Sequence, residues 1–309
     1  KKKPDLIYVY NLVTLGAVAF MLRRLWGCRV LMDIQDLWPE SVAGSGMMNN
    51  AFFLERLTRF CNRIYCGADA LAVLSPGFKN NLIARGLSQE KVDVVYNWCD
   101  EESLARDVPG DVLRNDLALA GKFVVLFAGT MGAQQGLDAV LEAAALCLGR
   151  FPDVRFVLAG GGTEKDRLAK KAADKKLSNV IFLPFRPAEA MGEVFGLADA
   201  LLVHLKDDPV FRVTIPSKTQ AGLFMGRPLI MAVQGDAAEL VAQAGAGVIC
   251  RPEDPEDLVR AVGKLAGLSA DARKLLGEKA RLFYEQRLSL QAGAAQFEEV
   301  FARIAVAAG

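Results

Sequence analysis

The segment at residues 123–146, FVVLFAGTMGAQQGLDAVLEAAAL, restricts the fold more than any other part of the chain. Its first six residues are apolar, a length that suits a strand covered on both faces and is too short for a helix. A short turn with three glycines follows: Gly129, Gly132 and Gly136. Glycine can adopt positive φ and lets a ligand approach the backbone, and the helix that begins at Leu137 has free N–H groups in its first turn. The pattern predicts either an anion-binding turn or an ordinary strand-to-helix corner.

Composition narrows the class of protein. The chain has 309 residues, of which 52% are hydrophobic and 24% charged, which is typical of a soluble protein with two domains. A net charge of +1 excludes binding of nucleic acid or membrane through overall charge. The six cysteines form no CxxC pair, so we expect reduced thiols in a cytoplasmic protein and no metal site. The single histidine, His204, makes a Ser-His mechanism improbable.

Two series of alternating strands and helices run along the chain. We expect strands at residues 6–10, 29–34, 70–74 and 92–96, and then at 123–128, 154–159, 180–183, 200–205, 228–233 and 247–250. Such series form parallel sheets with right-handed crossovers, so the fold class is α/β with two Rossmann-like lobes and a cleft between them. We expect the first lobe at residues 1–105, the second at 106–275, and terminal helices at 276–309 that pack back toward the first.

A helix expected at residues 50–67 combines aromatic and basic side chains. They are Phe52, Phe53, Arg56, Arg59 and Arg63. Such a face can rest on an anionic membrane surface, or it can cover the sheet and leave its arginines in water. Both interpretations stay open.

Two other motifs lie at expected strand ends. Asp33 and Asp36 follow the strand at 29–34, at the edge where open α/β sheets bind ligands, although Asp36 or Ser41 could equally cap the next turn. Gly160 to Gly162 follow the strand at 154–159, but Lys165 stands where a dinucleotide fingerprint needs its third glycine. A dehydrogenase is therefore disfavoured.

Several ordered motifs together resemble the GT-B glycosyltransferases of family 4. They are DLWPES (36–41), SPGF (75–78), KVDVVYNWCD (91–100), 129–137, LAGGG (158–162), PSK (216–218), GRP (226–228) and RPEDPEDL (251–258). They cover nearly the whole chain and are similar to enzymes of bacterial surface-polysaccharide synthesis, with N-acetylfucosamine transferases as the nearest type. The resemblance implies a GT-B fold and a metal-independent, retaining transfer of an N-acetylhexosamine-type sugar from a UDP-sugar donor to a polyprenyl-diphosphate-linked saccharide. No cofactor is implied, and the location would be cytoplasmic, at the inner face of the membrane.

The resemblance also implies a set of site residues. The turn would face the diphosphate with Gly129, Thr130, Gly132, Gln134, Gln135 and Gly136. The base would be read around Phe185 and Arg186, and Arg212, Thr214, Pro216, Ser217 and Lys218 would lie near the sugar and β-phosphate. Lys218 would stabilise the leaving group, and Asp36 and Asn97 would bind substrate in the first lobe.

Some positions depart from the family pattern. Thr130 and Gln135 stand where many members have arginine and lysine, and Val213 and Ala221 stand where a pair of glutamates is usual. Lys218 and Arg212 are then expected to bind the diphosphate instead. Where a first-lobe histidine is usual, the chain has Tyr10 and Asn11.

The first lobe also lacks its usual glycine-rich opening, so we expect it to be incomplete at its N-terminus by about three strand–helix units. A non-catalytic nucleotide-sugar binder or scaffold fragment is the alternative function, and an epimerase of UDP-N-acetyl sugars is the third.

Overall fold

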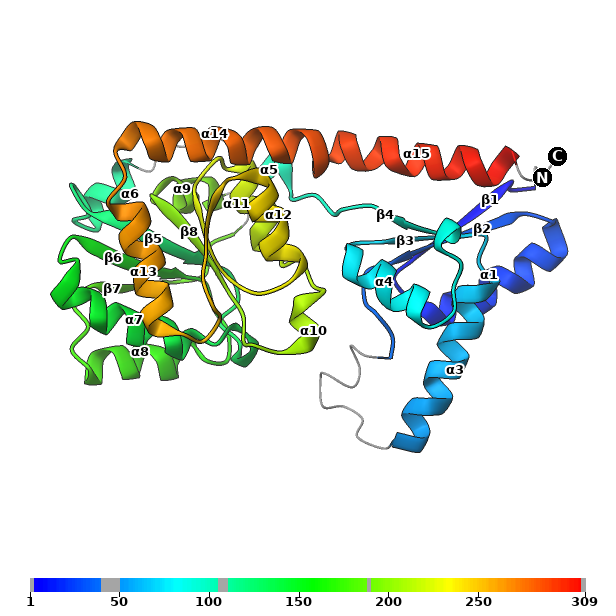
Figure 1. The fold of residues 1–309 in the computed structure, drawn as a ribbon, viewed down its shortest axis with the longest axis horizontal. Helices are drawn as coiled ribbons and strands as arrows, with labels where there is room; N and C mark the ends of the chain where they lie inside the picture. Colours follow the sequence, from blue (N-terminus) through cyan, green and yellow to red (C-terminus); the bar gives the residue numbers. More distant parts are fainter. Residues whose placement is uncertain (1–2, 40–50, 105–110, 188–189, 307–309) are drawn as a thin grey trace. The chain divides into compact units, whose positions relative to one another are not determined.

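The computed structural model describes residues 3–39, 51–104, 111–187 and 190–306, which belong to two compact units (Figure 1). The first unit comprises residues 1–97 and 291–309, and the second comprises residues 98–290. Each unit is built around one parallel sheet, which confirms the predicted α/β fold class with two Rossmann-like lobes. The boundary expected between residues 105 and 106 lies outside the described residues.

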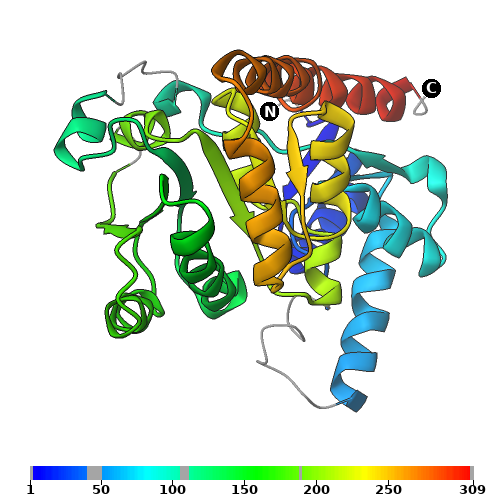
Figure 2. The same ribbon diagram turned by 60° about the vertical axis from the view of Figure 1, so that its left-hand side comes forward.

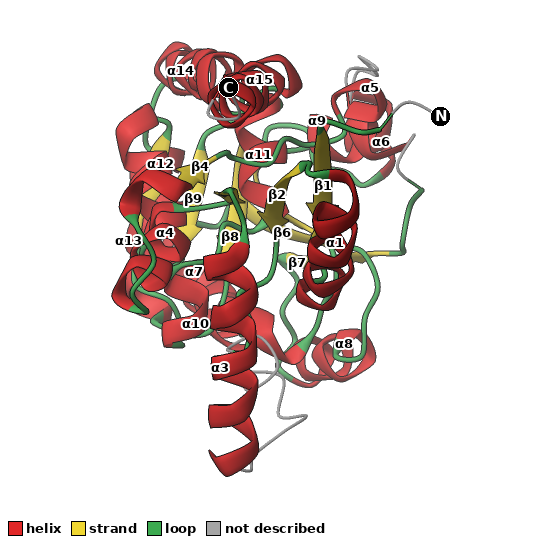
Figure 3. Cartoon of the chain, turned by 90° about the vertical axis from the view of Figure 1, so that its right-hand side faces the viewer, coloured by secondary structure: helices red, strands yellow, loops and turns green. Residues whose placement is uncertain are grey.

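The first unit contains a four-stranded parallel sheet in the order β1-β2-β3-β4. Its strands are β1 (Leu6–Tyr10), β2 (Arg29–Ile34), β3 (Ala70–Val73) and β4 (Val92–Val94). Its helices are α1 (Val13–Trp26), α3 (Ala51–Gly67), α4 (Pro76–Ala84), the 3-10 turn η1 (Gln89–Lys91) and α15 (Leu290–Val306). Figure 3 shows α1 against β1 and β2.

Local signals in the sequence set the ends of these helices. Helix α1 ends at Gly27, whose φ of 71° is left-handed and whose N–H bonds to the carbonyl of Arg23. Helix α4 begins after Ser75, whose hydroxyl accepts from the N–H of Phe78 at 3.1 Å, and Pro76 occupies the first helical position. Each feature satisfies a backbone group that the helix leaves unpaired.

Helix α15 covers the other face of the first sheet. Val300 and Ile304 pack against Leu31 and Ala72, with Phe297 and Phe301 beside them. An ion pair joins Arg303 of the helix to Asp93 of β4. Because these side chains are buried together, residues at the end of the chain complete the core of the first unit.

The second unit contains a six-stranded parallel sheet in the order β10-β9-β8-β5-β6-β7. Its strands are β5 (Phe123–Ala128), β6 (Val154–Ala159), β7 (Val180–Leu183), β8 (Ala200–His204), β9 (Leu229–Ala232) and β10 (Gly247–Ile249). Helices α7 (Leu137–Arg150), α8 (Lys165–Asp174) and α13 (Pro255–Ala266) enclose one core with the sheet, and Figure 2 shows α7 beside α13.

The second unit contains seven further helices among its described residues. They are α5 (Glu101–Leu104), α6 (Asp111–Asp116), α9 (Met191–Gly196), α10 (Pro209–Arg212), α11 (Ser217–Phe224), α12 (Asp236–Ala244) and α14 (Ala270–Arg287). Helix α14 packs against α11 and α12. Of the terminal segment expected at 276–309, residues up to 290 belong to the second unit and residues 291–309 to the first. Besides the expected break after α13, the helical run is interrupted at Leu288 and Ser289.

Candidate functional site

The glycine-rich turn lies where the carboxyl ends of three strands of the second sheet meet. The Gly129 N–H bonds to the carbonyl of Ala159 at 2.9 Å, and the Gly160 N–H bonds to the carbonyl of Leu183 at 3.3 Å. These bonds join the ends of β5, β6 and β7. The turn at residues 129–136, here called the cradle, therefore occupies the edge where parallel α/β sheets bind ligands.

The cradle glycines have different conformations. Gly129 and Gly136 have φ of 140° and 59°, which favours glycine at both positions. Gly132 instead has an extended φ of −104°. The space beside Gly132 is filled by the side chain of Gln134, because a Cβ at Gly132 would lie 2.5 Å from its Oε1. The capacity for positive φ is used at two of the three glycines.

The start of α7 presents unpaired backbone donors to the cradle. Within the part of the chain that the structure describes, no group accepts from the N–H of Leu137 or Asp138. The Asp138 carboxylate bonds to Arg167 and Lys171 of α8, and these cations hold its pKa far below the usual value. Because its charge is compensated, Asp138 does little to repel an anion at the helix start.

Lys218 supplies a cation to the cradle from the first turn of α11. Its Nζ lies 3.0 Å from Oε1 of Gln135 and 4.9 Å from the ring centre of Phe127. Its methylene chain lies against Gly129, where an added Cβ would be 2.6 Å from Cε. Burial lowers the pKa of Lys218 to about 8, because a buried ammonium loses its hydration.

Gln135 explains how the cradle accommodates this lysine. The side chain of Gln135 is only 7% exposed, and its amide oxygen accepts from Lys218. A lysine at position 135, which the family resemblance leads one to expect, would place a second ammonium in the same buried space. Two such cations would repel each other and cost desolvation energy. The ammonium of Lys218 thus lies beside position 135, where the family pattern leads one to expect a lysine.

A hollow of about 350 Å³ opens beside the cradle. It is lined by Gly129, Thr130, Ala159, Gly160, Gly161, Gly162, Pro184, Phe185, Arg186 and Met191. Gly160 allows the two loops to approach closely, since a Cβ there would lie 2.1 Å from the carbonyl oxygen of Gly129. Phe185 is 74% exposed, and Arg186 lies 3.9 Å from Glu193. An aromatic ring with this exposure offers a flat apolar face for stacking with a planar group.

The other expected donor-site residues have local partners in the structure. The guanidinium of Arg212 lies 3.1 Å from Asp207, and the hydroxyl of Thr214 donates to the carbonyl of Val210 at 3.0 Å. Pro216 caps α11, whose first residue, Ser217, is exposed. The contacts of Arg212 and Thr214 stay within the segment before α11, whereas Lys218 extends from the first turn of α11 to the cradle.

In the first unit, a chain of hydrogen bonds surrounds a buried carboxyl group at the end of β2. The Tyr8 hydroxyl and the Gln35 amide both donate to Asp33, which is 6% exposed, and Asn97 donates to Gln35 at 2.6 Å. Burial raises the pKa of Asp33, while these hydrogen bonds oppose the rise. Asp36, the expected binding residue, is exposed. Sequence reasoning missed Tyr8, and the alternation of β1 gives no signal for its bond to Asp33.

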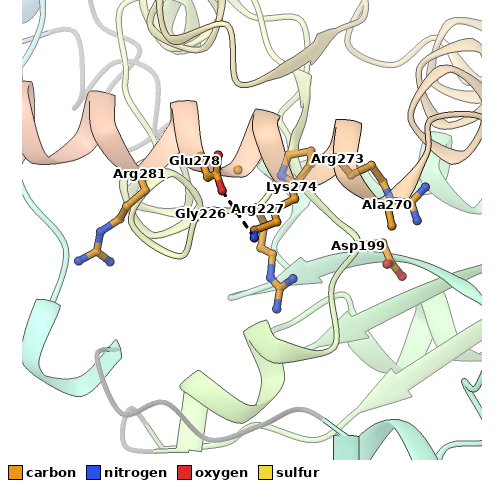
Figure 4. Close-up of a pocket in the computed structure, with 10 residues that line it drawn as sticks. Asp199, Gly226, Arg227, Ala270, Arg273, Lys274, Glu278 and Arg281 are labelled. Carbon is orange, nitrogen blue, oxygen red and sulfur yellow. Dashed lines mark ion pairs between the residues drawn. The ribbon is translucent and has the colours of Figure 1, made fainter.

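A second hollow, of about 490 Å³, lies at the opposite edge of the second sheet (Figure 4). Its lining includes Asp199 and Pro228, which precede β8 and β9, and an ion pair of Lys274 with Glu278 at 3.8 Å. Ligands of open α/β sheets bind at the carboxyl ends of strands, so the geometry favours the cradle as the site.

Among residues 3–39, 51–104, 111–187 and 190–306, no three histidine, cysteine or acidic side chains are grouped so that they could hold a metal ion. Asp208 caps α10 through the N–H of Val210, and Asp207 pairs with Arg212. The two aspartates therefore have structural partners.

Comparisons with known proteins identify the family of the chain. Residues 111–283 match the family described as Glycosyl transferases group 1, and residues 1–98 match the Glycosyl transferase 4-like domain. The protein WcaI of Escherichia coli K12, whose name assigns it a glycosyl transferase role in colanic acid biosynthesis, is 28% identical over 253 residues. That match covers 78% of this chain and 61% of WcaI.

Another relative shares a shorter part of the chain. The alpha-galactosylglucosyldiacylglycerol synthase of Streptococcus pneumoniae is 29% identical over 57% of this chain and 48% of its own length. The chain thus spans about half to three-fifths of the length of these two relatives.

Solved structures share the fold. Alr3699/HepE of Anabaena, in a complex with UDP, superposes with a TM-score of 0.77 at 19% identity, over 97% of this chain and 79% of that one. Sucrose-phosphate synthase of Thermosynechococcus elongatus superposes with a TM-score of 0.72 at 18% identity, over 98% and 74%. At this identity the likeness concerns the fold, which is that of GT-B glycosyltransferases. Since one family description matches more than half of the residues, the chain belongs to the glycosyl transferases group 1 family.

Proposed function

We propose that this chain is a glycosyltransferase that binds the diphosphate of a UDP-sugar in the cradle of its second unit. The observation that carries the proposal is the position of Lys218, whose ammonium lies beside Gln135 and above the ring of Phe127. Backbone N–H groups at the start of α7 supply further donors for phosphate oxygens. The proposal is supported by family membership and by the UDP and UDP-glucose complexes of the structurally similar Alr3699/HepE.

The group that most needs stabilisation during the reaction is the leaving diphosphate. The bond between the anomeric carbon and the β-phosphate oxygen breaks, a bond to the acceptor oxygen forms, and the proton of the acceptor hydroxyl passes to the departing diphosphate. Negative charge grows on the β-phosphate as its bond to the sugar breaks. The ammonium of Lys218 and the amides of α7 are fixed before the reaction, so they stabilise this charge without reorganisation. The fold family leads us to propose transfer with retention of configuration.

Calorimetric titration with UDP and UDP-sugars tests the donor site. We expect Lys218→Met to weaken UDP binding about 10- to 100-fold, the effect of losing one charge-assisted bond in a buried site. Lys170→Met is the matched control, because Lys170 lies on α8 and its side chain is 77% exposed. The UDP affinity of this variant should equal that of the wild type. No binding by the wild type at millimolar UDP would contradict the proposal and favour a scaffold. Binding without turnover would favour a nucleotide-sugar binder.

We further propose that the donated sugar is of the N-acetylhexosamine type and that the acceptor is a lipid-linked saccharide, as in surface-polysaccharide synthesis. The relation to WcaI, named for colanic acid biosynthesis, supports this step. Turnover assays with a panel of UDP-sugars and short-chain polyprenyl-diphosphate saccharides test it. Transfer only to water or to soluble sugars would contradict the lipid-linked acceptor.

Helix α3 offers a surface for contact with the membrane that holds such an acceptor. Its phenylalanines are exposed by 65% at Phe52, 54% at Phe53 and 41% at Phe60, and the guanidinium of Arg56 lies 4.9 Å from the ring centre of Phe52. Within the described residues, no helix has the length and hydrophobicity needed to cross a membrane. We propose that this face rests on the anionic cytoplasmic leaflet.

Sedimentation with anionic liposomes tests the α3 surface. Replacing Arg56, Arg59 and Arg63 together by glutamate should reduce the bound fraction, since each basic residue near the surface contributes about 1 kcal/mol. The control changes three exposed lysines of the second unit by the same charge: Lys170, Lys274 and Lys279. An equal loss in both variants would show that overall charge, and not this face, governs binding.

A further inference from the structure

His204 is the single histidine of the chain and lies immediately behind the cradle. It is the last residue of β8 and is 1% exposed. Its Nδ1 lies 2.7 Å from the carbonyl oxygen of Gln135, and its Nε2 lies 3.3 Å from the backbone nitrogen of Glu253. Both ring nitrogens therefore have a backbone partner.

These two partners determine where the imidazole proton resides. A backbone N–H can only donate, so Nε2 must accept from Glu253 and carry no proton. The proton then resides on Nδ1 and is donated to the Gln135 carbonyl oxygen, and the ring is neutral. Burial also lowers the pKa of His204, which agrees with a neutral ring.

Gln135, whose backbone carbonyl bonds to His204, also contacts Lys218, the cation of the site. The carbonyl of Gln135 accepts from His204, while the side chain of Gln135 accepts from Lys218. Next to it, the carbonyl of Gln134 accepts from the N–H of Lys206 at 3.0 Å. The end of β8 thus fixes two successive carbonyl groups of the cradle.

Close packing also restrains the contact between His204 and the cradle. A Cβ at Gly136 would lie 3.1 Å from Cε1 of His204, so the imidazole fits directly against this glycine. On its other side, Glu253 has a φ of 55°, unusual for a residue other than glycine, and its carboxylate accepts from the N–H of Asp207 at 2.9 Å. The ring is therefore held between the cradle and the loop that follows β10.

We propose that His204 is a positioning residue for donor binding, which orients Gln135 and thereby Lys218 through its Nδ1–H bond to the Gln135 carbonyl. The proposal rests on the proposed function, because it assigns His204 to the diphosphate site. His204 does not contact the donor in this scheme. It acts only through Gln135, and the loop at Glu253 keeps the required tautomer by donating to Nε2.

The tautomer can be observed directly by ¹⁵N-detected NMR of the imidazole. Because the chain contains one histidine, the imidazole signals belong to His204, and couplings to the ring C–H protons distinguish Nδ1 from Nε2. We expect one protonated and one unprotonated nitrogen, with the proton on Nδ1, unchanged from pH 8 to well below the ordinary histidine pKa of about 6.5. A proton on Nε2, or an imidazolium at neutral pH, would overturn the proposal.

Two amide substitutions separate the two hydrogen bonds. Asparagine places an N–H donor near the position of Nδ1, whereas glutamine places an acceptor near the position of Nε2. His204→Asn keeps the bond to Gln135, so its UDP affinity should stay within about threefold of the wild type. His204→Gln leaves the buried Gln135 carbonyl without its donor, and its affinity should fall about tenfold.

Urea unfolding of both variants verifies that each is folded before its affinity is compared. Equal affinities of the two folded variants would overturn the positioning role. If His204→Asn does not fold, folded His204→Gln is compared with the wild type alone, and a UDP affinity within about threefold of the wild type would overturn the positioning role. The predicted tautomer in a wild-type protein that binds no UDP would overturn the proposed function, while UDP binding with the wrong tautomer would overturn only the role of His204.

Discussion

The buried ammonium of Lys218 makes donor binding sensitive to alkaline pH. Burial lowers its pKa from an ordinary value of 10.5 to about 8. The diphosphate binds the charged form, and its own ionisation is complete above about pH 7.5, because the second phosphate pKa is about 6. The affinity for UDP should therefore fall as the pH rises through 8.

The size of the effect follows from the fraction of protein that is ready to bind. At pH 7 about nine-tenths of the free protein carries the Lys218 ammonium, and at pH 9 about one-tenth does. The apparent dissociation constant should thus rise about tenfold between these two pH values. Binding should also take up close to one proton at pH 9, because the diphosphate restores the charge on Lys218.

Without ligand, a rise in pH has the opposite effect and stabilises the folded protein. The unfolded chain keeps Lys218 protonated up to about 10.5, whereas the folded protein releases this proton above about 8. Between these values the unfolded state binds more protons, so the contribution of Lys218 to the free energy of unfolding rises with pH. Alkaline pH should relieve the cost of burying the charge and at the same time weaken UDP binding.

Isothermal titration calorimetry in buffers of different ionisation enthalpy measures both the affinity and the proton uptake. Lys218→Met is the comparison, since it has no titrating group in the cradle and its weaker affinity should not change between pH 7 and 9. Constant wild-type affinity over this range, or an equal pH dependence in Lys218→Met, would refute the assignment of Lys218 to the diphosphate.

Three further predictions concern single substitutions in the second unit. Gly160→Ala should lower the free energy of unfolding in urea by about 2–4 kcal/mol, because the added Cβ would lie 2.1 Å from a cradle carbonyl oxygen. Gly149→Ala is the control and should not lower the free energy of unfolding, because the space around Gly149 is open. Tyr284→Phe loses a hydroxyl bond to Glu101 and should cost about 1–2 kcal/mol in the same assay, and no change would contradict that bond's role. Phe185→Ala should leave unfolding unchanged but weaken UDP binding about tenfold, as loss of base stacking would; equal affinity would reject stacking.

Sequence pattern predicted much of the fold because short buried strands and glycine turns have local signatures. The apolar run 123–128 became β5 with all six residues buried, and Gly129 and Gly136 took the positive φ that glycine permits. Strand order carries no such local signal. The placement of β5 between β8 and β6 depends on how whole helices pack, which no short segment specifies.

The candidate site could be predicted only in part, for a similar reason. The family resemblance indicates both Lys218, in the PSK motif, and Gln135, in the turn and at a position where many members have lysine. Neither motif predicts the hydrogen bond that joins the two side chains. His204 and Gln135 lie 69 positions apart, and Tyr8 and Asp33 lie 25 apart. Contacts between distant positions depend on register and rotamer, so a single sequence gives no means of pairing them.

The division of the chain has a consequence for the order in which the protein folds. The second unit is one uninterrupted stretch, residues 98–290, whereas the first unit needs Phe297, Val300 and Ile304 to finish its interior. During synthesis β1 to β4 leave the ribosome before α15, so one apolar face of their sheet stays exposed until α15 follows. The second unit can therefore reach its native state earlier than the first, and the nascent first sheet is the part that a chaperone would have most reason to protect.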